Sequence, residues 1–320
     1  METTKKRFNG FYLLLILVLS VAHPFEENSD AQEITPPDVF SRVALVRNEI
    51  ELIRRYMGKP KETRPEIEIA DAAPREVYFQ ALTLFRKIDQ LCFELTRQRA
   101  VMPPIPAAEI HPSHVLEVVQ AGLECLQEIK KEMNITQTNV APERDMNKTP
   151  SDVFRSVVQG NRQINLLLVR EFSPSDVYQE VTTAINYAAF LLRRFPDIET
   201  RIPDAPPFES NKVPADVYRL LVKCFALIRE ISNLSGLTML KWNDTEDTDK
   251  LVPSDVYDIA SLLISELHYI NQQAGNNPPP KSYFPGLRFP SHVFQRAGIL
   301  KTQLMELLKQ VKAQPNWLKK

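Results

Sequence analysis

One short phrase recurs eight times along the chain and constrains its fold more than any other feature. The phrase is Pro, a small or polar residue, an acid or His, Val, and then an aromatic residue or Leu. Its first prolines are Pro36, Pro74, Pro112, Pro150, Pro174, Pro214, Pro253 and Pro290. Three equal intervals of 38 residues, a fourth of 24 and then intervals of 40, 39 and 37 separate them. This periodicity predicts eight copies of one unit, in two sets of four.

The phrase is a helix start signal. Proline suits the first helical position, and the residue before it is pushed away from helical backbone angles, as an N-cap should be. Thr35, Thr149 and Ser173 are good N-cap residues at that place. Two residues after each proline stands an acid or a His, at the position that a capping box uses. These residues are Asp38, Glu76, His114, Asp152, Asp176, Asp216, Asp255 and His292.

Each start is followed by apolar residues in alternating steps of three and four, which indicates a packed helical seam. After Pro74 the seam runs through Tyr78, Ala81, Phe85 and Ile88. We expect helices of about 22 residues, or about 33 Å. The connectors are Pro-rich, carry apolar residues and have a nearly constant length, so we expect extended segments packed on the helices. Up-down and parallel helix arrangements both remain open.

The fold class is therefore all-α: eight long amphipathic helices, in two duplicated four-helix units with Pro-rich extended connectors. Residues 35–172 form the first unit, 173–312 the second, and 313–320 a C-terminal tail. The duplication is also indicated by two similar helix ends, Leu-Ile-Arg-Arg-Tyr at 52–56 and Leu-Leu-Arg-Arg-Phe at 191–195. The repeat lacks the signatures of tetratricopeptide, ankyrin and leucine-rich repeats.

The N-terminus has the pattern of a secretory signal peptide. Lys5, Lys6 and Arg7 precede an apolar run over 11–21, and small residues favour cleavage after Ala22. The alternative is an uncleaved membrane anchor, but the run is shorter than the ~20 residues that span a bilayer. We expect a signal peptide over 1–22 and a short flexible segment over 23–34. The mature protein is then periplasmic or secreted, with no membrane span.

Composition excludes several function classes. The net charge of −1 argues against nucleic acid as a partner, since phosphate binding needs a surplus of Lys and Arg. With 8 Gly against 25 Pro, the chain has no glycine-rich phosphate-binding loop. Three cysteines are too few for a disulfide framework, and we expect buried core thiols.

Two sets of residues are candidates for a site. The acid and His column has metal-ligand chemistry, but we interpret it as helix capping and expect no metal or cofactor. Arg54, Arg55, Arg193 and Arg194, joined by Arg64 and Arg201, are candidates for a pseudo-twofold anion site. The alternative for these arginines is a cation at a helix C-terminus, where it offsets the dipole.

These observations favour a non-enzymatic interaction or scaffold protein with a protein partner, because helical repeats leave broad surfaces free. The segment 276–289 is a candidate docking strip, or else one more packed connector. The second hypothesis is a periplasmic protein that binds a small ligand, such as an anion, between helices or between the two units. The third is an enzyme whose site is assembled in space. A deep pocket with converging arginines favours the ligand hypothesis, and an exposed apolar strip favours the scaffold. The oligomeric state stays open.

Overall fold

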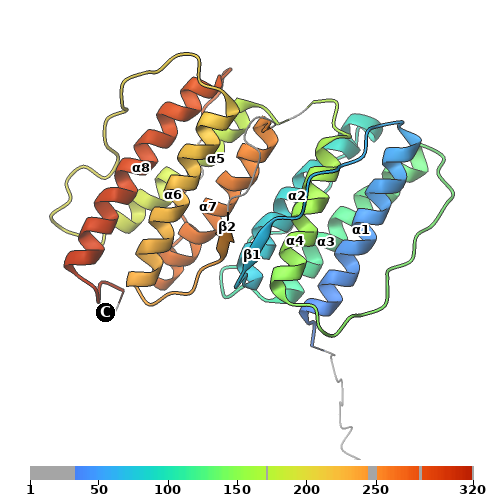
Figure 1. Ribbon diagram of the computed structural model, residues 1–320, viewed down its shortest axis with the longest axis horizontal. Coiled ribbons are helices and arrows are strands. Elements are labelled where there is room, and N and C mark those ends of the chain that lie inside the picture. Colours follow the sequence, from blue (N-terminus) through green and yellow to red (C-terminus); the bar gives the residue numbers. More distant parts are fainter. Residues whose placement is uncertain (1–32, 171, 244–250, 281–282, 319–320) are drawn as a thin grey trace, which may run out of the picture. The chain divides into compact units, whose positions relative to one another are not determined.

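The computed structural model describes residues 33–170, 172–243, 251–280 and 283–318, and the predicted signal peptide and most of the segment after it lie outside these ranges. The described residues form eight helices and two short strands, so the prediction of an all-α chain is confirmed (Figure 1). The helices are α1 (Pro36–Tyr56), α2 (Pro74–Thr96), α3 (Pro112–Glu132), α4 (Pro150–Asn165), α5 (Pro174–Leu192), α6 (Pro214–Leu234), α7 (Pro253–Gln273) and α8 (Pro290–Ala313). The strands are β1 (Glu68–Ala70) and β2 (Lys241–Asn243). No described helix is both long enough and apolar enough to cross a membrane.

Every helix begins at the first proline of its phrase. At each start, the side chain two residues after the proline accepts a hydrogen bond from the backbone N–H of the residue before the proline. In α4 this bond runs from Thr149 N to Asp152 Oδ2 at 2.8 Å, and Thr149 Oγ1 accepts from Asp152 N in return. In α3 and α8 a histidine Nδ1 replaces the carboxylate, as between His111 N and His114 Nδ1 at 3.0 Å. A neutral imidazole nitrogen can accept this bond, which explains why His shares the column with Asp and Glu.

The four helices of each set run parallel. The prolines and valines of the starts of α1, α2, α3 and α4 line one common hollow, and those of α5, α6, α7 and α8 line another. Four helices that start at one place share one direction. Each N-terminus carries a partial charge of about +0.5, and the three carboxylates of each set lie where they offset it. The sequence left up-down and parallel arrangements open, and in the structure the helices of each set are parallel.

The connectors return along the helices. Gln303 donates to the carbonyl of Arg201, and Gln295 to that of Pro206, so the connector residue numbers rise while those of α8 fall. The connector between α1 and α2 follows α4 in the same way, with Arg162 bonded to Pro65 O and Arg155 to Ile69 O. At ~3.3 Å per extended residue against 1.5 Å in a helix, these segments are long enough for the return.

The two sets have the same packing order. In the first set α1 and α2 each pack on α3 and α4, and in the second α5 and α6 each pack on α7 and α8. In each set, the connector that returns along a helix ends in an equivalent hydrogen bond. These bonds run from Ala72 N to Ser151 Oγ and from Lys212 N to Ser291 Oγ, both at 3.1 Å. The likeness agrees with an internal duplication, which stays a prediction. Residues 34–320 nevertheless belong to one compact unit.

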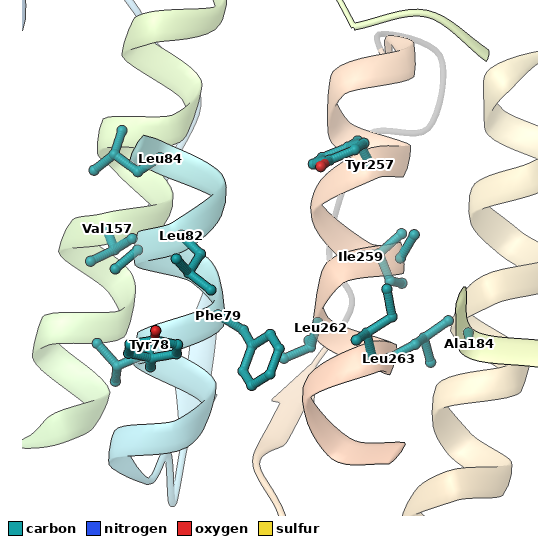
Figure 2. Close-up of a cluster of buried hydrophobic side chains, with 14 of the residues drawn as sticks. Tyr78, Phe79, Leu82, Leu84, Val157, Ala184, Tyr257, Ile259, Leu262 and Leu263 are labelled. Atoms are coloured by element: carbon teal, nitrogen blue, oxygen red, sulfur yellow. The ribbon is translucent and has the colours of Figure 1, made fainter. Parts of the chain in front are cut away.

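Helices α2 and α7 join the two sets. They pack antiparallel, because Arg75 at the start of α2 reaches Glu266 late in α7, whereas Lys87 meets Asp258 near the start of α7. Figure 2 shows Phe79 of α2 directed toward α7 beside Leu262. On one side of this contact β1 pairs antiparallel with β2, with Ile69 opposite Trp242. Most residues of α2 and α7 are buried.

Two details differ from expectation. Helix α4 has only 16 residues, fewer than the predicted 22 or so, because a turn at Leu166 leads directly into the short link to α5. The predicted C-terminal tail also packs on the second set. The ring of Trp317 lies 5.5 Å from that of Phe195, and its Nε1 donates to Ser235 Oγ at 2.9 Å.

Candidate functional site

The four arginines proposed as an anion site each have a local partner. Arg54 and Arg55 pair with Glu51 on the same helix. Arg193 lies over the ring of Phe190, and Arg194 donates to the carbonyl of Trp317. Arg54 and Arg55 lie on α1, and Arg193 and Arg194 directly follow α5. Helices α1 and α5 are not among the described helix pairs that pack together. The structure therefore does not bring the two arginine pairs to one point.

The other two arginines of that proposal also lie apart. Arg64 bonds to Glu62 and to Asp255 at the start of α7. Arg201 lies in the connector along α8, where its carbonyl accepts from Gln303.

The acid and His column is split between the two sets of helix starts. Each member of the column bonds to the backbone N–H before its own proline, which occupies one acceptor atom. Four members of the column therefore lie at the end where α1 to α4 begin, and the other four lie at the end where α5 to α8 begin. Within the described part of the chain no three or more His, Cys, Asp or Glu side chains form a group that could hold a metal ion.

A pocket of about 450 Å³ lies where the two sets meet, on the other side of the α2–α7 contact from the strands. Its walls come from α2, α5 and α7 and from the connectors that precede α3 and α8. Phe79, Leu82 and Ile264 make apolar walls, and Pro278 and Pro279 line the connector side. A volume of this size is typical of a small-molecule site, as is an apolar wall with a few polar groups.

His268 and Tyr187 form the buried polar pair of this pocket. The Tyr187 hydroxyl lies 3.0 Å from His268 Nδ1. Only 4% of His268 is exposed, and its Nε2 has no hydrogen-bond partner among the described residues. Burial lowers the pKa of His268 and raises the pKa of Tyr187 to about 12. Both groups are therefore neutral at physiological pH, and His268 Nε2 is a buried polar atom without a partner among the described residues.

Arg86, Glu180 and Tyr257 form a second polar group, of which Arg86 and Glu180 line the pocket. Arg86 Nη1 donates to the Tyr257 hydroxyl at 2.9 Å and lies 3.5 Å from Glu180 Oε1. Tyr257 in turn donates to Glu180 at 3.2 Å. Burial and Glu180 raise the pKa of Tyr257, so the phenol keeps its proton. The positive charge of Arg86 and the negative charge of Glu180 therefore compensate each other within the pocket wall.

Buried charges on the remaining α2–α7 contact fix the two sets against each other. Lys87 is fully buried and reaches Asp258 at 2.6 Å. Burial raises the pKa of Asp258 to about 6, although Lys87 opposes this shift. Arg75 lies 2.7 Å from Glu76 and 3.6 Å from Glu266. Burial and Glu76 raise the pKa of Glu266 well above its ordinary value, although Arg75 opposes this shift. These contacts hold the pocket walls in place.

Reasoning from the sequence missed the pocket residues Arg86, Tyr187 and His268. A signal was present in the two helices that join the sets. The stretch 77–85 of α2 and the stretch 259–264 of α7 are mainly apolar on every face, which indicates helices buried all round. The polar residues within such helices are candidates for a buried site. Tyr187 of α5 could not be predicted from this pattern, since its position beside His268 depends on how the helices pack.

A search of protein-family models, curated proteins and solved structures found no match to this chain. The function therefore has to be argued from the pocket and the surface of this molecule.

Proposed function

We propose that this chain is a non-enzymatic, exported protein that binds a small molecule in the pocket between its two four-helix sets. The observation that carries the proposal is His268, which lines a 450 Å³ pocket and whose buried Nε2 has no hydrogen-bond partner among the described residues. Buried polar atoms in proteins are nearly always hydrogen-bonded, so an unpaired one on a residue that lines a pocket supports a bound partner there. The fixed α2–α7 contact supports the same conclusion, because rigid walls reduce the entropy that binding costs.

The test uses N-phenyl-1-naphthylamine, a neutral dye that fluoresces in apolar sites. Thr183 lines the pocket and donates to the carbonyl four residues before it in α5. We expect wild type to bind the dye and Thr183→Trp, which fills the pocket, to bind it roughly tenfold more weakly or not at all.

Thr302 makes the same helix bond but is exposed on α8, outside the pocket, so Thr302→Trp is the matched control. Its dye binding should stay within about twofold of wild type. Equal dye binding by wild type and Thr183→Trp, or no binding by wild type, contradicts the proposal.

A second candidate function, protein binding, is favoured by an exposed apolar patch on the second set. Tyr283, Leu287 and Phe289 are 79%, 73% and 57% exposed, and Phe208 is 51% exposed. The backbone beneath them is fixed, since Phe284 N donates to Gln179 and Arg288 N to Ser175 Oγ. Exposed apolar side chains that gather within one segment, as Tyr283, Leu287 and Phe289 do, are typical of protein contact sites.

This candidate is tested with the double variant Leu287→Glu and Phe289→Glu. Both side chains lie outside the core, so the fold should persist. We expect tagged wild type to enrich a defined partner from the native compartment, and the variant to lose that partner while keeping dye binding. Identical partner sets for the two proteins, by quantitative mass spectrometry, contradict a docking role for the patch.

A further inference from the structure

The bond between Tyr187 and His268 can be made in two ways. Either the phenol donates to Nδ1 and Nε2 carries the imidazole proton, or Nδ1–H donates to the phenol oxygen and Nε2 is bare. The phenol, with an ordinary pKa of about 10, is a far stronger acid than a neutral imidazole N–H. The imidazole nitrogen is also the better base. The stronger donor and the stronger acceptor meet only when Tyr187 donates to Nδ1.

Tyr187 is held in place for this bond. Its backbone carbonyl accepts from Asn271 Nδ2 at 3.1 Å, one helical turn from His268 on α7. The two rings meet edge to face, with centroids 5.7 Å apart. Phe79 covers another side of the imidazole at 5.6 Å. The ring therefore keeps one orientation, and Nε2 is left as a buried N–H donor without an acceptor among the described residues.

The described residues of the pocket wall carry no net charge. The charged residues among them are Arg86 and Glu180, which pair with each other and with Tyr257. His268 is neutral because burial lowers its pKa. Transfer of an unpaired ion from water into such an apolar site is unfavourable, whereas transfer of a neutral molecule is not.

From these contacts we infer that the ligand is a neutral, largely apolar molecule whose carbonyl oxygen accepts a hydrogen bond from His268 Nε2. This inference rests on the proposed function and specifies its ligand class. It replaces the anion that the arginine pairs suggested, because Arg86, the one arginine among the described wall residues, is already paired. The apolar walls from Phe79, Leu82 and Ile264 receive the body of the molecule, and the imidazole fixes its one polar end.

The protonated nitrogen is tested first, without any ligand. The chain has five His, and nitrogen-15 NMR of His-labelled protein distinguishes a protonated from a bare ring nitrogen. The His268 signals are assigned by their loss in His268→Gln. We expect a bare Nδ1 and a protonated Nε2. The reverse pattern overturns the inference even if the pocket binds dyes.

The ligand class is tested with three naphthalene probes of similar size. Prodan is neutral and has a carbonyl group, N-phenyl-1-naphthylamine is neutral without one, and 1-anilinonaphthalene-8-sulfonate is an anion. We expect the sulfonate to bind roughly tenfold more weakly than prodan. Tightest binding by the sulfonate overturns the inference.

Substitution of His268 separates the hydrogen bond from the packing. We expect His268→Leu to weaken prodan binding about fivefold and to leave N-phenyl-1-naphthylamine within about twofold, since only prodan loses a hydrogen bond. His268→Gln keeps an amide donor and should recover most of the prodan affinity. Equal losses for both neutral probes overturn the carbonyl contact, whereas failure of every probe to bind wild type overturns the proposed function instead.

Discussion

The guanidinium of Arg64 donates to the carboxylate of Asp255 at 3.0 Å, so a connector of the first set is tied to a helix start of the second. The other carboxylate oxygen of Asp255 caps α7 by accepting from Val252 N at 3.0 Å. One side chain thus serves the local helix start and the contact between the sets.

Asp255→Ala should cost more stability than Asp216→Ala. Asp216 caps α6 in the same way, with a bond from Val213 N at 3.0 Å, and it pairs with exposed Arg219. We expect about 0.5–2 kcal/mol for Asp216→Ala, the cost of a lost cap. Loss of Asp255 also removes one of the two carboxylates that the half-buried Arg64 contacts among the described residues, which should cost about 1–3 kcal/mol more. Urea denaturation of both variants measures the difference, and equal losses would show that the Arg64 pair is unimportant.

His114→Asp should stabilise the first set. His114 accepts from His111 N at the start of α3 but brings no negative charge to that helix end. A carboxylate makes the same bond and offsets the dipole, which is worth about 0.3–1 kcal/mol. The reverse change, Asp152→His, should destabilise α4 by a similar amount or more, since Asp152 also pairs with Arg155. A rise in the urea midpoint for the first variant and a fall for the second are expected, and opposite signs contradict the capping role.

Glu266→Gln should flatten the pH dependence of stability. Because the pKa of Glu266 is raised in the folded protein, the folded state keeps a proton that the unfolded state releases above about pH 4.5. Its contribution is therefore present at low pH and declines as pH rises toward the folded pKa. The lowered pKa values of Asp38, Glu62 and Asp152 act in the opposite sense, and their contribution is lost as pH falls below about 4.

Unfolding free energies from pH 4.5 upward measure this effect. The variant should lose less stability than wild type as pH rises over that range. Glu132→Gln, at an exposed position at the end of α3, is the control and should follow wild type. Parallel curves for Glu266→Gln and wild type would show that Glu266 is ionised in the folded protein.

Gly298→Ala should destabilise the protein, although alanine is the better helix former by about 1 kcal/mol. A Cβ on Gly298 of α8 would lie 2.7 Å from the ring of Pro206 in the returning connector. At Gly122 of α3 the nearest atom is the flexible end of Ile88, at 3.3 Å, so Gly122→Ala is the control. We expect a loss of about 1–3 kcal/mol for the first change and a much smaller effect for the second. Stabilisation by Gly298→Ala would show that this connector does not pack closely on α8.

The sequence predicts the helix starts well because each start is encoded locally. A proline and a capping side chain two residues later suffice to place it, and all eight helices begin at the proline of their phrase. The direction of neighbouring helices is different in kind. It depends on whether a connector runs back along a helix, and contacts such as Gln303 with Arg201 involve residues about 100 positions apart.

The candidate site could not be predicted from the sequence for the same reason. Tyr187 and His268 belong to different helices, and their 3.0 Å contact depends on how α5 packs on α7. Arg86 reaches Tyr257 only because α2 packs antiparallel on α7. The arginines near the helix ends stood out because their pattern is repeated, yet each has a partner close by. The repeated residues of this chain therefore mark where its helices begin and end, whereas the pocket is built from residues that belong to no repeated pattern.

The most direct test of the proposed binding site is a crystal structure of the protein grown with prodan. We expect the naphthalene ring between Phe79 and Ile264 and the carbonyl oxygen about 2.7–3.2 Å from His268 Nε2. A pocket that stays empty at saturating prodan, or prodan bound elsewhere on the protein, would contradict the account.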